Sequence, residues 1–106
     1  MLTRDLRTLA ACANGVLHGH SAPFARVISD SRALEPGALF VALVGERFDG
    51  HDFVAEAARL GAAGALVSRR VDAALPQVVV PETLAGLATF ANAWRFKTGL
   101  KDFAAS

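Results

Sequence analysis

The sequence predicts an α/β fold in which a small, mostly parallel sheet is flanked by helices. Residues 38–44 form an apolar run without alternation, which is typical of a central strand buried on both faces. A shorter apolar run follows at 64–67, and apolar residues recur at helical spacing between the two runs. The order strand, helix, strand indicates a βαβ unit, and therefore parallel pairing with a right-handed crossover.

A helix is expected before this unit. It should begin at Thr3 as N-cap and run to about Ala13, with its apolar residues at Leu6, Leu9, Ala10 and Ala13. Asn14-Gly15 should end it, because glycine accepts the left-handed conformation that closes a helix.

The segment between this helix and the central strand is richer in turn formers. Residues 16–24 are polar, which predicts a short hairpin or loop. A short strand is expected over 26–29. Glu35-Pro36-Gly37 then has the composition of a turn, since proline fixes φ and glycine accepts positive φ.

The rest of the chain alternates helices and strands. Asp52 is expected to cap a helix that ends at Gly61, with Phe53, Ala57 and Leu60 along one stripe. Pro76 introduces a third strand at 77–80. A last helix should be capped by Thr83 and end at Gly99, with Leu84, Leu87, Ala91 and Trp94 on one face.

Composition limits the possible functions. The chain has 106 residues, enough for one domain with one core, of which 53% are hydrophobic and 20% charged. A net charge of +1 with scattered basic residues predicts no nucleic-acid partner. A single cysteine, Cys12, is typical of a reduced cytoplasmic protein, and the charged N-terminal segment resembles neither a signal peptide nor a membrane span. We therefore expect a cytoplasmic protein without a membrane partner.

Two loops carry candidate binding residues. Asp30-Ser31-Arg32 directly follows a predicted strand, where a hydroxyl and a guanidinium can bind a heterocycle or a phosphate. From this triplet alone, a solvated turn is the favoured interpretation. The loop Gly45-Glu46-Arg47-Phe48-Asp49-Gly50-His51 joins a buried strand to a helix start, a place where α/β sheets bind ligands. Here we favour a ligand site over a plain turn with His51 on the surface.

Other residue types are better explained by structure. His18 and His20 have no third ligand at suitable spacing, so no metal site is predicted. The phenylalanines Phe40, Phe48 and Phe53 are expected to anchor the core or the loop, although Phe48 could border a base. No phosphate loop, nucleophile elbow or pair of catalytic acids is present, so no catalytic residue is expected.

The ordered set of motifs resembles a known family. Asp30-Ser31-Arg32 is followed by Pro36-Gly37-x-Leu39-Phe40-Val41-Ala42, then by Gly45 and Asp49-Gly50-His51-x-Phe53, and finally by Gly61-Ala62-Ala63-Gly64-Ala65 and Pro76. From Ile28 to about Trp94 this pattern resembles the N-terminal domain of the Mur ligases, the ATP-dependent amide-forming enzymes of peptidoglycan synthesis. The form of residues 45–53 is most similar to the branch that adds D-Ala-D-Ala.

The resemblance implies a function for the domain and roles for its residues. In this family the N-terminal domain holds the UDP part of the UDP-MurNAc-peptide substrate. It implies that Ser31 and Arg32 lie near the uridine or diphosphate. The opposite wall would be shaped by Gly45, Arg47, Asp49, Gly50 and His51.

The resemblance also implies domains that this sequence does not include. Residues 1–95 would be the substrate-binding domain and 96–106 a linker or tail, with the central ATP-binding and C-terminal domains absent. The expected substrate is UDP-MurNAc-tripeptide. ATP and Mg would act only in the full-length ligase, and the fragment, expected to be a monomer, should be inactive. Two alternatives remain: a stand-alone interaction or regulatory module, and the same domain of a ligase that adds the third residue.

Overall fold

The computed structural model describes residues 5–98, of which 93–98 are described as backbone only. Five strands form one sheet, in the order β1-β5-β4-β3-β2. β2 (Val27–Ile28), β3 (Leu39–Val41), β4 (Gly64–Val67) and β5 (Gln77–Val79) pair in parallel, and β1 (Val16–His18) pairs with β5 in the antiparallel sense. The predicted α/β fold with a mostly parallel sheet is therefore confirmed.

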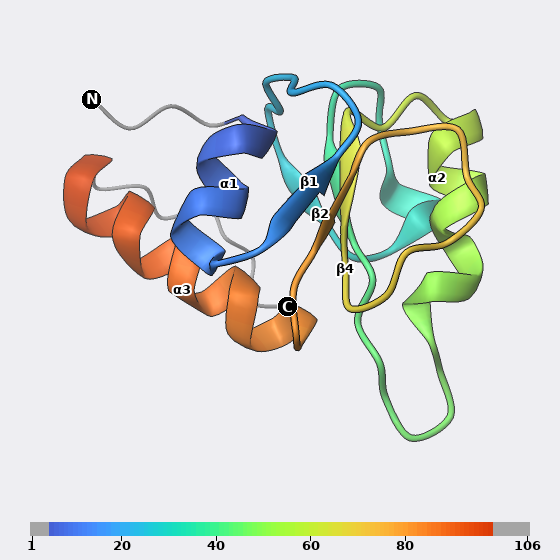
Figure 1. The fold of residues 1–106 in the computed structure, drawn as a ribbon. Coiled ribbons are helices and arrows are strands. Elements are labelled where there is room, and N and C mark those ends of the chain that lie inside the picture. Colours follow the sequence, from blue (N-terminus) through green and yellow to red (C-terminus); the bar gives the residue numbers. More distant parts are fainter. Residues whose placement is uncertain (1–4, 99–106) are drawn as a thin grey trace.

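Helices cover both faces of the sheet (Figure 1). α1 (Leu6–Ala13) and α3 (Thr83–Thr98) pack together on one face, and α2 (Val54–Arg59) lies on the other. α2 connects the parallel strands β3 and β4, as expected of a βαβ unit. Within the described part of the chain, no helix is both long and apolar enough to span a bilayer.

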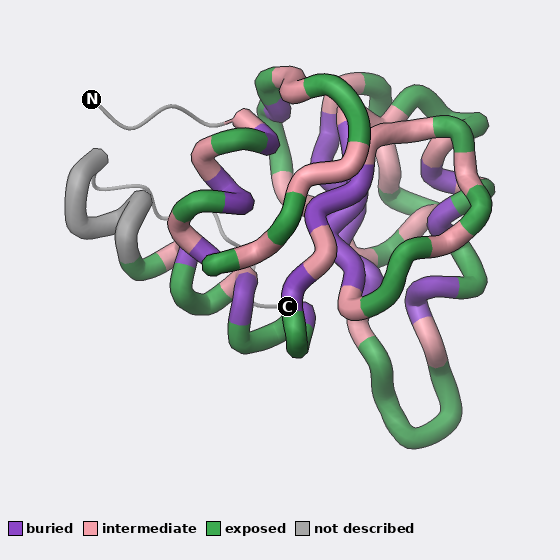
Figure 2. Tube along the Cα trace, viewed as in Figure 1, coloured by how far each residue is buried: buried purple, intermediate pink, exposed green. Residues whose placement is uncertain are grey.

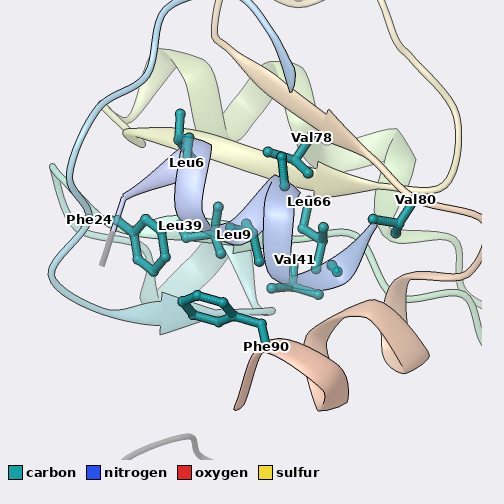
Figure 3. Close-up of a cluster of buried hydrophobic side chains, with 11 residues drawn as sticks. Leu6, Leu9, Phe24, Leu39, Val41, Leu66, Val78, Val80 and Phe90 are labelled. Atoms are coloured by element: carbon teal, nitrogen blue, oxygen red, sulfur yellow. The ribbon is translucent and has the colours of Figure 1, made fainter. Parts of the chain in front are cut away.

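The buried residues of β3 and β4 alternate between two cores. On the α1 and α3 side, Leu39, Val41 and Leu66 join the two helices in a cluster that Figure 3 shows. On the α2 side, Phe40, Ala42, Ala65 and Val67 pack against Val54 and Ala57. A strand between two apolar layers needs no polar positions, which explains the continuous apolar runs in the sequence.

Several predicted helix boundaries differ from the structure. Asp5 caps α1, its carboxylate accepting the Thr8 N–H at 2.8 Å, whereas Thr3 lies outside the described residues. Asn14, not Gly15, takes the left-handed conformation after α1, with φ 58°. The buried positions of α1 are Leu6, Leu9, Ala10 and Ala13, as its periodicity predicted.

α2 and α3 also begin differently from expectation. Asp52 does not cap α2; Asp49 instead caps a 3₁₀ helix, η2 (Gly50–Phe53), that leads into α2. Phe53 and Leu60 are exposed rather than on the buried stripe, and Gly61 ends the helix region with φ 91° as expected.

The first turn of α3 is capped by the preceding residue. Glu82 accepts the N–H groups of Leu84 and Ala85, so Thr83 is a buried helix residue and not the cap. Leu84 is exposed, and Phe90 takes the buried position instead. The side chain of Trp94 and the predicted end at Gly99 lie outside what the structure describes.

Residues 16–24 do not form a local hairpin. β1 pairs instead with β5, far along the sequence, with Val16 opposite Val79. The central strand is also shorter than 38–44: beyond Ala42 the chain leaves the sheet, and Val44 is exposed. The shorter central strand leaves residues 43–49 as a loop at the carboxyl end of β3.

Candidate functional site

A pocket of about 420 Å³ opens where β2 ends, on the side of the sheet that α2 covers. Its lining is Ser29, Asp30, Ser31, Arg32, Phe40, Phe48 and Phe53. These residues come from three segments: the turn after β2, the middle of β3, and the loop with η2 that follows β3. The pocket thus combines a polar rim with aromatic walls at the edge of the sheet where α/β proteins bind small molecules.

The polar rim is organised by Asp30. Its carboxylate accepts the Arg32 backbone N–H at 3.0 Å and so caps a short 3₁₀ helix, η1 (Ser31–Ala33). The same carboxylate receives the Arg32 guanidinium in a two-point contact, at 3.1 Å from Nε and 3.0 Å from Nη2. The side-chain hydrogen bond between these two residues lowers the pKa of Asp30 and raises the pKa of Arg32.

This arrangement leaves two groups of the rim available to a ligand. Arg32 is held in one orientation by Asp30 while its side chain remains 89% exposed. Ser31 is half-buried, and its hydroxyl makes no hydrogen bond to any other described residue. A hydroxyl can both donate and accept, which suits the mixed carbonyl and N–H edge of a heterocycle.

Three phenylalanines form the apolar walls. Phe40 is fully buried in β3 and closes the inner end of the pocket. Phe48 and Phe53 are 46% and 39% exposed, and their rings stack with centroids 5.5 Å apart and planes 18° apart. Large apolar side chains that stay partly exposed at a pocket are typical of a binding surface.

The loop that carries Phe48 is a tight excursion beyond the end of β3. The Gly45 N–H donates to the Phe48 carbonyl at 2.7 Å, and Val44 and Asp49 form an antiparallel bridge. Figure 1 shows this loop extending from the body of the domain, and Figure 2 shows that it is largely exposed. Arg47 lies exposed in it without a hydrogen bond to any described residue.

Five of the residues proposed from the sequence therefore lie outside the lining of the pocket. Ser31 and Arg32 line it, whereas Gly45, Arg47, Asp49, Gly50 and His51 do not. Gly50 lies directly against the end of β3, where an added Cβ would come within 2.8 Å of the Leu43 nitrogen. The role of these five residues in binding UDP stays a prediction.

His51 is buried, although it is a polar residue. Its side chain is fully buried, contrary to the surface position that a plain turn would give it. Its Nδ1 lies 2.7 Å from Asp49 Oδ1, and its Nε2 lies 2.9 Å from the Ser68 backbone nitrogen. Because a backbone N–H can only donate, Nε2 is the acceptor and Nδ1 carries the proton.

Asp49 links this histidine to a neighbouring loop. Its Oδ1 also accepts the His51 backbone N–H at 2.9 Å, and its Oδ2 receives Arg69 at 3.1 Å. The hydrogen bonds from the His51 backbone and side chain, with a smaller contribution from Arg69, lower the pKa of Asp49 to about 2. No group of three or more histidine, cysteine or acidic side chains is arranged for a metal among the residues that the structure describes.

The sequence predicted the core position of Phe40 but not the aromatic lining of the pocket. Phe40, Phe48 and Phe53 were assigned to the core or to loop anchoring, and only Phe48 was considered beside a base. The available signal was the position of these residues, because Phe40 lies within β3, Phe48 lies in the loop that follows it, and Phe53 ends η2. Fold and pocket together describe a small α/β domain with a partly aromatic pocket at the carboxyl edge of its sheet.

Comparison with known proteins places this domain in a family. The family described as "Mur ligase family, catalytic domain" matches residues 24–95. UDP-N-acetylmuramoyl-tripeptide–D-alanyl-D-alanine ligase of Escherichia coli is 47% identical over 78% of this chain and 18% of that protein. The 2,6-diaminopimelate-adding ligase of Bacillus licheniformis is 40% identical over 61% of this chain and 13% of its own length. The chain belongs to the Mur ligase family.

Solved structures agree with this assignment. A crystal structure of MurF from Acinetobacter baumannii superposes with a TM-score of 0.78 at 32% identity, over 92% of this chain and 21% of that one. MurF from Thermotoga maritima, in complex with ADP, gives a TM-score of 0.62 at 34% identity, over 68% of this chain and 17% of that one. The chain spans less than a quarter of the length of each of these relatives.

Proposed function

We propose that residues 1–95 are the domain that holds the UDP part of UDP-MurNAc-tripeptide in a ligase that adds D-Ala-D-Ala during peptidoglycan synthesis. The observation that carries this proposal is the pocket between η1 and the Phe48 loop, with its polar rim and aromatic walls. The 47% identity to the Escherichia coli enzyme of that name supports the choice of substrate.

The chemistry of the pocket suits a uracil ring. A planar base gains most by lying against aromatic faces, which Phe40, Phe48 and Phe53 supply. Its carbonyl and N–H edge would meet the Ser31 hydroxyl and the backbone of the turn after β2. Arg32, held by Asp30 and otherwise exposed, would lie toward the diphosphate.

In this proposal the domain binds substrate and does not catalyse amide formation. ATP and Mg would be bound by a central domain, and the dipeptide by a C-terminal domain, with residues 96–106 as the linker toward them. The ADP complex of the Thermotoga maritima relative supports the ATP dependence. The full-length protein would act as a cytoplasmic monomer, with no nucleic acid or membrane as partner.

A domain of a third-residue-adding ligase is the weaker candidate. It is favoured by the 40% identity to the Bacillus licheniformis enzyme, but that match covers only 61% of the chain. The D-Ala-D-Ala-adding relative matches at higher identity over 78%.

An assay of the full-length protein from the same gene separates these candidates. With UDP-MurNAc-tripeptide, ATP and Mg, we expect phosphate release to depend on D-Ala-D-Ala. When the substrate is UDP-MurNAc-dipeptide instead, adding 2,6-diaminopimelate or L-lysine should cause no phosphate release. Residues 1–106 alone should release no phosphate with either pair. Turnover only with the dipeptide substrate and an amino acid would contradict the proposal.

A further inference from the structure

A fully buried histidine, His51, connects the segment that carries Phe48 and Phe53 to the end of β4. His51 belongs to η2, which follows β3, whereas Ser68 directly follows β4. The Ser68 backbone N–H donates to His51 Nε2 at 2.9 Å, and the Ser68 hydroxyl lies 3.2 Å from the same nitrogen. The contact therefore connects two loops at the carboxyl edge of the sheet that are far apart in sequence.

Both ring nitrogens of His51 are occupied by the protein itself. Nδ1 donates to Asp49 and Nε2 accepts from Ser68, and none of the side chain is exposed. A ligand in the pocket would find neither nitrogen available. His51 is thus unsuited to direct contact with the substrate, and its effect on binding has to pass through the residues that it holds.

His51 and the residue that it holds, Asp49, lie close in sequence to Phe48 and Phe53. Asp49, which His51 holds through its side chain and its backbone N–H, directly follows Phe48. Phe53 is the last residue of η2, the element to which His51 belongs. Both stacked rings are therefore attached to the short segment that the histidine fixes to β4.

The tight packing beneath η2 leaves little freedom for another arrangement. The Gly50 N–H donates to the Leu43 carbonyl at 2.7 Å, and Gly50 has no room for a side chain against Ala42 and Leu43. Leu43 and Gly50 fix the base of the loop to the end of β3. The His51 ring adds the second attachment, to the end of β4.

We propose that His51 is a positioning residue of the pocket: its buried ring, hydrogen-bonded between Asp49 and Ser68, sets where the Phe48 and Phe53 rings lie. This inference rests on the proposed function only for the identity of the ligand. The position of the rings is a property of the unliganded domain. A binding surface carried by a loop needs such a support, because small displacements of contact groups weaken binding strongly.

The test measures ring position and affinity in the same samples. Residues 1–106 are compared with H51A by NMR, first for the ring-proton shifts of Phe48 and Phe53, then by titration with uridine 5′-monophosphate. We expect both ring signals to move in H51A and the affinity to fall about tenfold. V78A, a core substitution on the α1 and α3 side, controls for lost stability and should leave both readouts unchanged. H20A controls for loss of an exposed imidazole.

A second variant and a second measurement keep the inference testable if H51A does not fold. In H51Q the side-chain oxygen can accept the Ser68 N–H, but the amide NH2 lies one bond further from the backbone than Nδ1 and is misplaced for Asp49, so we expect a smaller loss of affinity in the same direction. Nitrogen-15 spectra of the wild-type imidazole should show the proton on Nδ1.

The outcomes test the positioning role of His51 separately from the identity of the ligand. Unmoved ring signals with unchanged affinity in the His51 variants, or a proton on Nε2 of the wild type, would overturn the positioning role. If wild type fails to bind uridine 5′-monophosphate, the proposed ligand is wrong. The ring signals would then still decide the role of His51.

Discussion

The ring of Phe48 stacks on the ring of Phe53 at a centroid distance of 5.5 Å, although neither is buried in a core. Phe48 lies in the loop after β3, and Phe53 ends η2, so the stack joins these two segments where both line the pocket. Exposing two large rings is unfavourable in water unless something covers them. Their exposure fits the proposal that the pocket binds a planar ligand.

Removal of one ring should therefore weaken binding more than folding. For F48A we expect the affinity for uridine 5′-monophosphate to fall by about 1 kcal/mol or more, the order of one base–aromatic stack. Urea unfolding should change by less than about 0.5 kcal/mol, because the side chain is 46% exposed. L84A, at an exposed leucine of α3, is the control and should leave affinity unchanged. Equal affinity of F48A and wild type would contradict a role for this wall.

Two glycines of the same loop should respond differently to alanine. At Gly50 an added Cβ would come within 2.8 Å of the Leu43 nitrogen and 2.9 Å of the Ala42 Cα, so the backbone has to move. We expect G50A to destabilise the domain by about 1–3 kcal/mol in urea unfolding. At Gly45 the nearest atom is 3.8 Å away, so G45A should unfold within about 0.5 kcal/mol of wild type. Equal stabilities of the two variants would show that Gly50 is not packed as described.

The stability of the domain should depend on pH through Asp49. The pKa of this carboxyl is lowered to about 2 by the hydrogen bonds from His51, with Arg69 contributing less. In the unfolded chain a carboxyl of this kind titrates near about 4. Folding thus favours the ionised form, and the stabilisation is fully present above pH ~4 and is lost as the pH falls through about 2.

Urea unfolding of wild type and D49N over this pH range measures the effect. The difference between their free energies of unfolding should be constant near neutral pH and shrink as the pH approaches 2. D52N, which replaces an exposed carboxylate of the same 3₁₀ helix, controls for the change of net charge. A difference that does not vary with pH would mean that Asp49 gains nothing from its ionised form.

The orientation of α3 gives a matched pair of core and surface substitutions. Phe90 is fully buried against the α1 side of the sheet, and its ring lies 5.9 Å from that of Phe24 (Figure 3). F90A should cost about 3–5 kcal/mol of stability. L84A should cost less than about 0.5 kcal/mol, because Leu84 is 59% exposed. The reverse order would place the helix with the opposite face inward.

Elements with a local signal were predictable from the sequence. The positions of β3 and β4 followed from apolar runs, and the buried face of α1 followed from helical spacing. Capping was less certain, because Asp49 and Asp52 both precede the helical stretch and either has the chemistry of a cap. The pairing of β1 with β5 could not be found, since it joins strands at opposite ends of the sequence without a local turn.

The residues of the candidate site also differ in how far the sequence could predict them. The roles of Ser31 and Arg32 were expected from the family resemblance, because the triplet alone favoured a solvated turn, and both residues line the pocket. The aromatic walls were missed because a phenylalanine in sequence looks the same in a core and at a pocket. The buried ring of His51 accepts a hydrogen bond from Ser68, seventeen positions away, and no spacing rule indicates this contact.

In our proposal, the pocket between η1 and the Phe48 loop binds the uridine end of the substrate. Titration of ¹⁵N- and ¹³C-labelled residues 1–106 with uridine 5′-monophosphate tests it most directly, with adenosine 5′-monophosphate as the control ligand. We predict saturable shifts at Ser31, Arg32, Phe48 and Phe53 with the uridine nucleotide, and much weaker ones with the adenosine nucleotide. Shifts confined to other surfaces, or equal responses to both nucleotides, would contradict the account.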